Sequence, residues 1–290
     1  MYSEISANKR KTFSMITVFI LLVCSLAWIL AKFLNANEYL TYYIILGSLV
    51  YVAVSYFTSS RAVLALNKAN QITKKDNPRL FRIVENLAIT EGLPMPKIYI
   101  IEEPAPNAFA TGRNPEHASV AITTGLLQIL DDKELQGVMA HELGHVKNYD
   151  IRVAIVAFAL VAVVGVISDI ILRISWFSDG DEDNRLFFIV GIIAGILAPF
   201  VAMLIQLAIS RKREFLADAT GALTTRYPEG LASALRKIDS SSQIMKRQNY
   251  TTAHFFFTNP LKKGTFMNLF STHPPINERI KRLNKMEENL

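Results

Sequence analysis

Residues 139–146 read MAHELGHV, and this HExxH pattern is the most specific feature of the chain. His141 and His145 are four residues apart, so on a helix both imidazoles project from one face. Such a pair can bind a single tetrahedral Zn²⁺ at about 2.0–2.1 Å. Glu142 follows the first histidine and would face the water that the metal activates. The pattern therefore predicts a zinc hydrolase site; two unrelated surface histidines beside a salt-bridging glutamate are the structural alternative.

The composition around this motif limits the class of protein. Of the 290 residues, 51% are hydrophobic and 19% are charged, which excludes a disordered chain and argues against a purely soluble globule. The net charge is +6, but the basic residues lie beside apolar runs, so anionic lipid headgroups explain them more simply than nucleic acid does. A single cysteine, Cys24, excludes an intramolecular disulfide, and the chain has no P-loop pattern that would support ATP binding.

Four long apolar runs predict four transmembrane helices. The first two, Thr12 to Ala31 and Tyr39 to Ser60, contain no charge and match a bilayer core in length, so we expect a helical hairpin. The fourth, Leu186 to Ser210, is also uncharged. The third is uncharged only from Val153 to Ser168, so spanning requires Asp169 to lie near the far interface. A buried helix of a soluble core is the alternative for this third run.

Clusters of lysine and arginine predict the orientation. They precede the first run and follow the second and fourth runs, whereas the loop around residues 179–183 is acidic. The polar segments should therefore share the cytoplasmic side of a plasma or inner membrane, with the active site facing the cytoplasm. The expected organisation is a transmembrane hairpin in residues 1–60, a first part of the cytoplasmic catalytic domain in 61–150, a second hairpin in 151–210 and a second catalytic part in 211–290.

The polar segments predict a small α+β domain. Asn77 and Pro78 are typical of the start of a helix, which should end at Gly92. A capping-box pattern of Asp131 and Glu134 should begin the motif helix. We expect a meander or hairpin sheet built from three strands, Lys97 to Ile101, Asn107 to Thr111 and Ala118 to Thr123. Two later apolar stripes, in residues 231–238 and 276–286, should be core faces of helices.

A catalytic zinc needs a third protein ligand and keeps its fourth position open. Asp150 should lie on a helix continuous with the histidine pair, which turns its carboxylate away, and Asp169 is assigned to the far interface. Glu214 and Asp218 remain, four residues apart directly after the fourth run. One of them can bind the metal while the other hydrogen-bonds the second nitrogen of a histidine. A carboxylate that only balances the basic cluster Arg211 to Arg213 is the alternative for Glu214.

The motifs together resemble those of the HtpX-type membrane zinc metalloproteases, which are related to the CaaX prenyl endopeptidases. The resemblance covers essentially the whole chain and rests on the two N-terminal apolar runs, NAFATG from Asn107, HELGH from His141, SRKREFLADATGA from Ser210 and FSTHPPINERI from Phe270. It implies a mainly α integral membrane protein with four transmembrane helices and a cytoplasmic, zincin-like (gluzincin) α+β protease domain with a small sheet.

The resemblance also assigns roles to residues. It implies that Glu214 is the third zinc ligand, Asp218 an outer partner of a ligand, His273 a stabiliser of the oxyanion and Arg279 a support of the site. The family usually has tyrosine where this chain has Phe215, so any hydrogen bond from that hydroxyl is absent here. One Zn²⁺ per chain, polypeptide substrates that are membrane or misfolded proteins, and a bacterial inner membrane as the location follow from the same resemblance.

The strand that contains Asn107, Ala108, Phe109 and Ala110 is a candidate for substrate binding. Small side chains bracket Phe109, so a free edge of this strand can pair with an extended substrate backbone. An ordinary internal strand is the alternative. His117 and His254 have no partner at ligand spacing and are interpreted as surface or core histidines.

We expect Glu142 to take a proton from the attacking water and to deliver it to the leaving amine. Two other functions are compatible with the pattern: a membrane scaffold with a structural metal, and a protease that cleaves within the membrane. Structural zinc sites are closed by four protein ligands, which distinguishes the scaffold. The charged residues Lys147, Asp150 and Arg152, directly after the motif, argue against a site inside a span.

Overall fold

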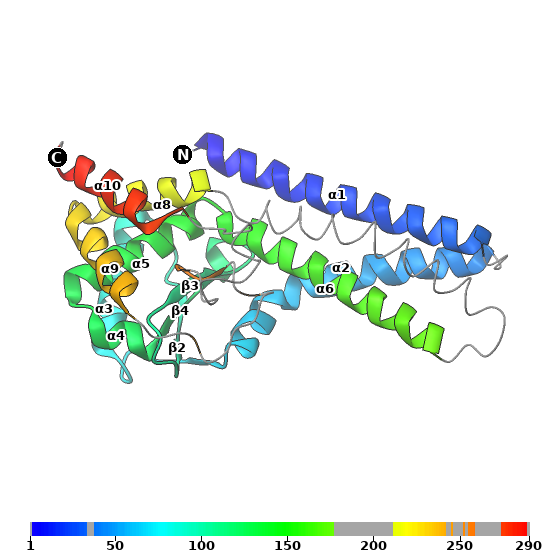
Figure 1. Ribbon diagram of the computed structural model, residues 1–290, viewed down its shortest axis with the longest axis horizontal. Helices are drawn as coiled ribbons and strands as arrows, with labels where there is room; N and C mark the ends of the chain where they lie inside the picture. Colours follow the sequence, from blue (N-terminus) through cyan, green and yellow to red (C-terminus); the bar gives the residue numbers. More distant parts are fainter. Residues whose placement is uncertain are drawn as a thin grey trace.

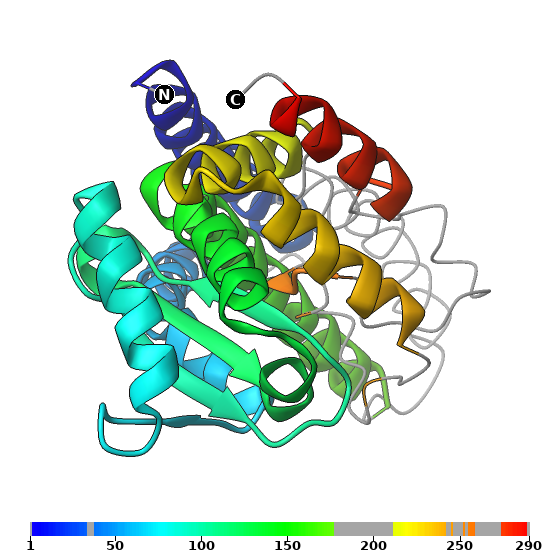
Figure 2. The same cartoon turned by 90° about the vertical axis from the view of Figure 1, so that its left-hand side faces the viewer.

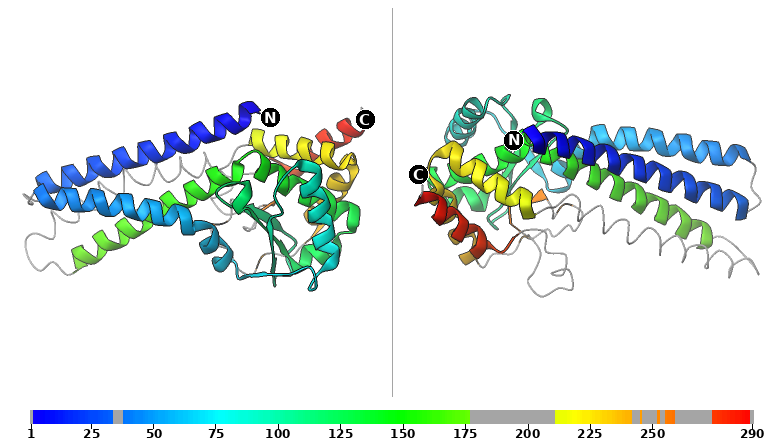
Figure 3. Two further views of the ribbon diagram at one scale, coloured as in Figure 1. Left: turned by 180° about the vertical axis from the view of Figure 1, so that it is seen from behind. Right: turned by 90° about the horizontal axis from the view of Figure 1, so that it is seen from above.

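The computed structural model describes residues 2–33, 38–176, 211–241, 245, 252, 255–258 and 274–288. Three long helices extend side by side from a domain that contains the sheet and the shorter helices (Figures 1 and 3). They are α1 (Tyr2–Phe33), α2 (Glu38–Leu66) and α6 (Asp150–Trp176), and each packs against the other two. The N-terminus of α1 lies beside the domain, so this helix runs away from the domain and α2 returns to it (Figure 1).

The surfaces of α1 and α2 are strongly apolar. Large side chains such as Trp28, Leu46 and Phe57 are exposed on them. Within the described part of the chain, one helical segment, Ile45–Leu66, is long and apolar enough to cross a membrane. The first two predicted runs lie on α1 and α2 and form the expected helical hairpin, and the third lies on α6. The fourth run, Leu186 to Ser210, lies outside the described residues, so four spans stay a prediction.

The domain contains a four-stranded sheet in the order β1-β2-β4-β3. Its strands are β1 (Ala69–Gln71), β2 (Lys97–Ile101), β3 (Ala108–Thr111) and β4 (Ser119–Thr123). β3 and β4 form an antiparallel hairpin, joined through a 3-10 turn at Pro115–His117, whereas β2 pairs with β4 in parallel. The predicted hairpin is confirmed for β3 and β4, whereas a meander of all three predicted strands is wrong, because the sheet is mixed and β3 lies at one edge.

A crossing loop explains this strand order. Residues 102–107 pass over the end of β4, so the chain reaches the far side of β4 before β3 begins. The backbone oxygen of Glu103 accepts hydrogen bonds from Gly125 N at 3.0 Å and Thr124 Oγ1 at 3.1 Å. A Cβ atom at Gly125 would lie 1.8 Å from the backbone oxygen of Pro104, so only glycine permits this approach.

Short helices cover the sheet and surround the motif helix (Figure 2). The motif helix is α5 (Asp132–Lys147), and the other short helices are α3 (Pro78–Glu91), α4 (Thr124–Ile129), α8 (Arg211–Thr225), α9 (Pro228–Ser240) and α10 (Ile276–Glu287). The predicted start signals of α3 and α5 are confirmed, since Asn77 caps α3 and Asp131 forms a reciprocal capping box with Glu134. The two predicted apolar stripes on α9 and α10 pack into the domain core, as expected.

The motif helix α5 lies in the middle of the domain. It packs against α3, α8, α9 and β3, and its side chains Leu135, Val138, Met139 and Leu143 are fully buried. Each buried aliphatic side chain of this size contributes roughly 1.5–3 kcal/mol relative to an exposed one. The core therefore fixes the position of the helix that carries both histidines.

The helix is interrupted between α5 and α6, so the prediction of one continuous helix is wrong. α5 ends at Lys147, Asn148 caps it, and Tyr149 has a left-handed backbone with φ 60°. Asp150 then starts α6 in a new direction. The carboxylate of Asp150 consequently points back toward the motif helix instead of away from it.

Candidate metal centre

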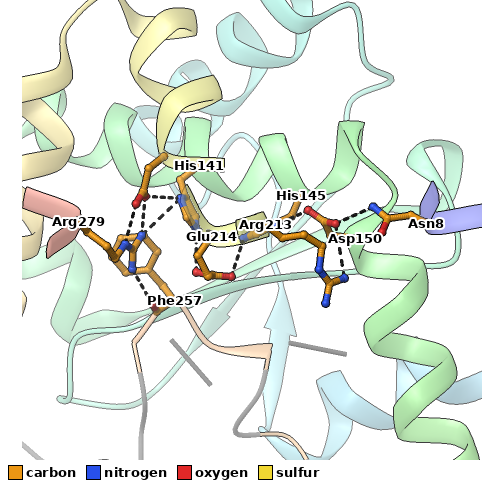
Figure 4. Close-up of polar contacts among 9 residues, drawn as sticks. Asn8, His141, His145, Asp150, Arg213, Glu214, Phe257 and Arg279 are labelled. Carbon is orange, nitrogen blue, oxygen red and sulfur yellow. Dashed lines mark hydrogen bonds and ion pairs between the residues drawn. The ribbon is translucent and has the colours of Figure 1, made fainter. Parts of the chain in front are cut away.

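Three side chains from two helices converge at the surface of α5. The Nε2 atoms of His141 and His145 lie 3.1 Å apart, and the Glu214 carboxylate, from α8, lies 3.7 Å from the first and 3.5 Å from the second. Ligand atoms of a tetrahedral site with bonds of about 2.0–2.1 Å lie about 3.3 Å apart. The three donors therefore fit one metal ion, and Figure 4 shows them facing one another.

Close packing of two helices brings Glu214 to the histidines. A Cβ atom at Gly221 of α8 would lie 3.0 Å from the backbone nitrogen of His141, tighter than ordinary contact. Gly144 of α5 faces Ala217 of α8 at the same interface. Because these positions are small, the helix axes can approach closely and the side chains of α8 reach the metal-facing side of α5.

The second nitrogen of His141 contacts a carboxylate that is itself tightly held. His141 Nδ1 lies 2.9 Å from Asp218 Oδ1, and Arg279 of α10 binds the same carboxylate through Nε at 2.9 Å and Nη2 at 2.7 Å. Arg279 is only 1% exposed, and its Nη1 donates to the Phe257 carbonyl at 3.3 Å. The guanidinium thus neutralises the buried carboxylate and fixes its orientation. We call His141, Asp218 and Arg279 the His141 network.

The second nitrogen of His145 has an equivalent carboxylate that the sequence analysis did not assign. His145 Nδ1 lies 2.9 Å from Asp150 Oδ2, and Asn8 Nδ2 donates to Asp150 Oδ1 at 2.8 Å. We call these three residues the His145 network. Figure 4 shows the polar residues in a row, from Arg279 at one end to Asn8 of α1 at the other. An asparagine shortly after the motif, at Asn148, was the available signal that the helix ends there and that Asp150 can turn back.

The two histidines differ in their proton affinity in the metal-free protein. Burial is the largest influence on His141 and lowers its pKa to about 4, against the opposing hydrogen bond to Asp218. Burial also acts to lower the pKa of His145, but the hydrogen bond to Asp150 and the charge of Glu214 outweigh it and raise the pKa to about 9. A metal binds neutral imidazole, so binding at neutral pH must displace a proton from His145.

The acidic side chains of the site are shifted in opposite directions. Burial raises the pKa of Glu142 to about 7, and the charge of nearby Glu214 acts in the same direction. Burial alone would raise the pKa of Asp218 as well, but the charge of Arg279 and the hydrogen bonds to it and to His141 hold this pKa far below its usual range. Asp218 is therefore an anion, whereas Glu142 can exchange a proton near neutral pH.

Glu142 lies between the metal-facing histidines and the edge strand β3. The backbone N–H of Ala110 acts on this carboxylate and lowers its pKa, against the larger effect of burial. In the antiparallel pair of β3 and β4, backbone groups of alternate residues point away from the partner strand, and Ala108 and Ala110 occupy those positions. The edge of β3 that does not pair with β4 therefore faces the candidate base, and all four residues of this strand are buried.

The predicted substrate residues divide into backbone and side-chain roles. The Asn107 side chain exchanges two hydrogen bonds with the backbone of Thr258, at 2.9 and 3.1 Å, so it secures the segment 255–258. The Phe109 ring is fully buried against Phe256. The Ala108 carbonyl accepts a hydrogen bond from Phe257 N at 2.8 Å, so another segment of the chain already pairs with one end of this edge.

The remaining predicted histidines are not near the three donors or lie outside the described residues. His117 is exposed and contacts Arg113 and Asn114, which confirms its interpretation as a surface residue. His273, expected to stabilise the oxyanion, and His254 lie outside the described residues. Phe215, at the position where the family resemblance predicts a tyrosine, stacks on the guanidinium of Arg282 at 3.5 Å.

Comparison with known proteins identifies the family. The sequence model of Peptidase family M48 matches residues 74–287. The chain belongs to peptidase family M48. It is therefore a metalloprotease, a hydrolase of peptide bonds, and membership implies a metal cofactor, for which the two imidazoles and one carboxylate are a suitable donor set.

Relatives of this M48 peptidase match along its full length. A Protease HtpX homolog of Tropheryma whipplei (strain Twist) is 53% identical over 288 residues, covering 99% of this chain and 98% of the relative. A Protease HtpX homolog of Dictyoglomus thermophilum is 43% identical over 292 residues, covering 99% of this chain and 95% of the relative. The crystal structure of S. mikatae Ste24p shares the fold, with a TM-score of 0.52, 19% identity, and coverage of 98% of this chain and 67% of that one.

Proposed function

We propose that this M48 peptidase is a zinc-dependent membrane endopeptidase that cleaves membrane or misfolded proteins on the cytoplasmic side, in membrane-protein quality control. The observation that carries the proposal is the convergence of the two Nε2 atoms and the Glu214 carboxylate beside buried Glu142. The printed names of the curated relatives, Protease HtpX homolog, and the apolar helices α1 and α2 support it.

In this proposal His141, His145 and Glu214 hold the zinc. When bound, Zn²⁺ supplies a Lewis acid that lowers the pKa of water and polarises the scissile carbonyl. Glu142 accepts the proton of the attacking water and transfers it to the leaving amine. The Asp218 carboxylate, held by Arg279, keeps His141 Nδ1 protonated and Nε2 directed at the metal. By family similarity, His273 donates to the oxyanion.

In this proposal the substrate binds along the edge of β3 that does not pair with β4. An extended substrate would pair with the backbone of Ala110, because this residue faces away from β4 and lies beside the base. Main-chain pairing recognises a peptide without requiring particular side chains. The side chains of Asn107 and Phe109 would support this strand from behind, and the Ala108 carbonyl, bound by Phe257, would mark the end of the paired region.

Two features favour this function over the alternatives. The motif helix packs mainly against α3, α8, α9 and β3 and meets α6 less extensively, which argues against cleavage inside the membrane. The described residues around the site offer one cluster of three donor atoms, whereas a closed structural zinc site has four protein ligands. A scaffold with a structural metal is therefore the weaker candidate.

The test compares Glu142→Gln with Glu85→Gln in full-length protein purified in detergent. Glu142→Gln cannot accept a proton, so hydrolysis of an unfolded fluorescent protein substrate should fall by roughly 10²–10⁴-fold, while the zinc content stays near one per chain. Glu85 is an exposed partner of Lys74 and should tolerate the same substitution. Wild-type activity in Glu142→Gln would reject the assigned base, and wild-type protein that neither binds zinc nor loses activity with a chelator would reject the zinc enzyme.

A further inference from the structure

The N-terminal helix contributes a polar side chain to the surroundings of the metal centre. Asn8 of α1 is only 5% exposed. Its Nδ2 atom donates to Asp150 Oδ1 at 2.8 Å and to the Asn148 backbone oxygen at 2.8 Å. An amide nitrogen carries two hydrogens, and both are used here. The contacts join α1 to the break between α5 and α6, about 140 residues away in the sequence.

The two oxygens of the Asp150 carboxylate have different partners. Oδ2 lies 2.9 Å from His145 Nδ1, while Oδ1 accepts from Asn8 and lies 3.5 Å from Arg213 Nη1. The amide of Asn8 therefore holds Oδ1 in the position that leaves Oδ2 directed at the histidine. Without that amide the carboxylate can rotate toward the guanidinium and form a closer ion pair, which would weaken its contact with His145.

A buried asparagine inside a helix, such as Asn8 of α1, is unusual and needs a physical reason. Asparagine is a poor residue for the interior of a helix, and burial of an amide is costly unless its hydrogen bonds are satisfied. Leucine or alanine would pack on α6 at lower cost. Asn8 recovers that cost through its two hydrogen bonds, and both acceptors belong to the segment that positions Asp150.

We propose that Asn8 is a positioning residue of the metal centre, through which the N-terminal helix orients Asp150 and so holds His145 toward the metal. The inference rests on the proposed function, because it takes His145 to be a metal ligand. It makes the affinity for zinc depend on how α1 packs against the domain. Deleting or displacing α1 would loosen one ligand while leaving the His141 network in place.

The experiment measures the zinc affinity of full-length protein in detergent by competition with a chromophoric chelator, with Co²⁺ absorption spectra reporting the ligand geometry. Loss of an outer partner of a ligand typically weakens metal binding by about 10–100-fold, which is the range expected for Asp150→Ala. Asn8→Ala acts one step further out and should weaken binding by roughly threefold to tenfold. Asn67→Ala is the matched control, because Asn67 is an equally buried asparagine that follows α2 and donates to Val63 O in the last turn of that helix.

A double-mutant cycle separates a positioning role from a general loss of stability. In the Asp150→Ala background, Asn8→Ala should cause no further loss of affinity, because its effect passes through that carboxylate. In the Asp218→Asn background, Asn8→Ala should retain its full effect. Asn8→Asp should weaken zinc binding more than Asn8→Ala, because it places a second carboxylate beside Asp150; this variant also serves if Asn8→Ala does not fold.

Three results would overturn the inference: wild-type zinc affinity in both Asn8 variants, an undiminished effect of Asn8→Ala in the Asp150→Ala background, or an equal loss in Asn67→Ala. Wild-type protein that binds no zinc would instead reject the proposed function, so the two failures can be told apart.

Discussion

The two histidines of the metal centre have similar partners but different supports. Each Nδ1 lies 2.9 Å from a carboxylate, Asp218 for His141 and Asp150 for His145. Asp218 is bound by both Nε and Nη2 of a buried arginine on the C-terminal helix α10. Asp150 is bound by a neutral amide on the N-terminal helix α1, with an arginine nitrogen at 3.5 Å. One support is a buried ion pair within the domain, and the other reaches the site from the long helices.

This difference predicts separate consequences for the two networks. Arg279 is charged and makes two parallel hydrogen bonds to Asp218, which adds geometric specificity as well as energy, so the His141 network should be rigid. The single amide of the His145 network is a weaker hold, and it depends on the packing of α1. The domain therefore fixes one ligand by itself, and the second ligand responds to the helices that extend from the domain.

Removal of the Arg279 side chain should have the largest effect. Arg279→Ala leaves the buried Asp218 carboxylate without its counter-charge, which typically costs 3–5 kcal/mol. We expect the free energy of unfolding to fall by about that amount and protease activity to be lost with it. Arg282→Ala is the control on the same helix, since its ion pair with Glu278 and its contact with Phe215 lie at the surface and should each contribute about 1 kcal/mol or less. Denaturant unfolding in detergent measures both, and equal losses would contradict the rigid role of the His141 network.

An added methyl group at the α5–α8 interface should have an intermediate effect. A Cβ atom at Gly221 would press on the His141 backbone at 3.0 Å, so Gly221→Ala must move α8 and Glu214 with it. Overpacking of this kind costs about 1–3 kcal/mol. Gly144→Ala is the matched control, because its Cβ would find its nearest atoms at 3.6 Å, an ordinary contact. Thermal unfolding and zinc affinity should both fall for Gly221→Ala only; equal tolerance of both substitutions would show that the close approach does not position Glu214.

Local signals in the sequence were sufficient for many elements of the domain. The cap at Asn77, the left-handed end of α3 at Gly92 and the reciprocal bonds of Asp131 and Glu134 depend on residues within one or two turns. The convergence of His141 with His145 follows from helical spacing alone. Such features are fixed by neighbours in the sequence, so a single chain reveals them.

Contacts between distant segments could not be predicted in this way. The parallel pairing of β2 with β4 depends on a loop that crosses the sheet, and periodicity within each strand does not contain that information. The prediction for Asp150 failed because one residue with φ 60°, Tyr149, interrupts the helix and changes the direction of the chain. Asn8 was missed for the same reason: nothing near it in the sequence identifies a partner some 140 residues away.

The smallest effect should come from adding the tyrosine hydroxyl that the family resemblance predicts at position 215. The Phe215 ring stacks on the guanidinium of Arg282, whose side chain is 55% exposed. The contact therefore lies at the protein surface and not among the atoms that face the metal. Phe215→Tyr keeps this cation–π contact and adds a hydroxyl, so the free energy of unfolding should change by less than about 0.5 kcal/mol. Because a change of 1.4 kcal/mol in the activation free energy corresponds to a tenfold change in rate, a change below about 0.5 kcal/mol keeps the activity within about twofold of wild type. A gain in activity of tenfold or more would show that the hydroxyl reaches the reacting groups, and that the His141 network is incomplete in this chain.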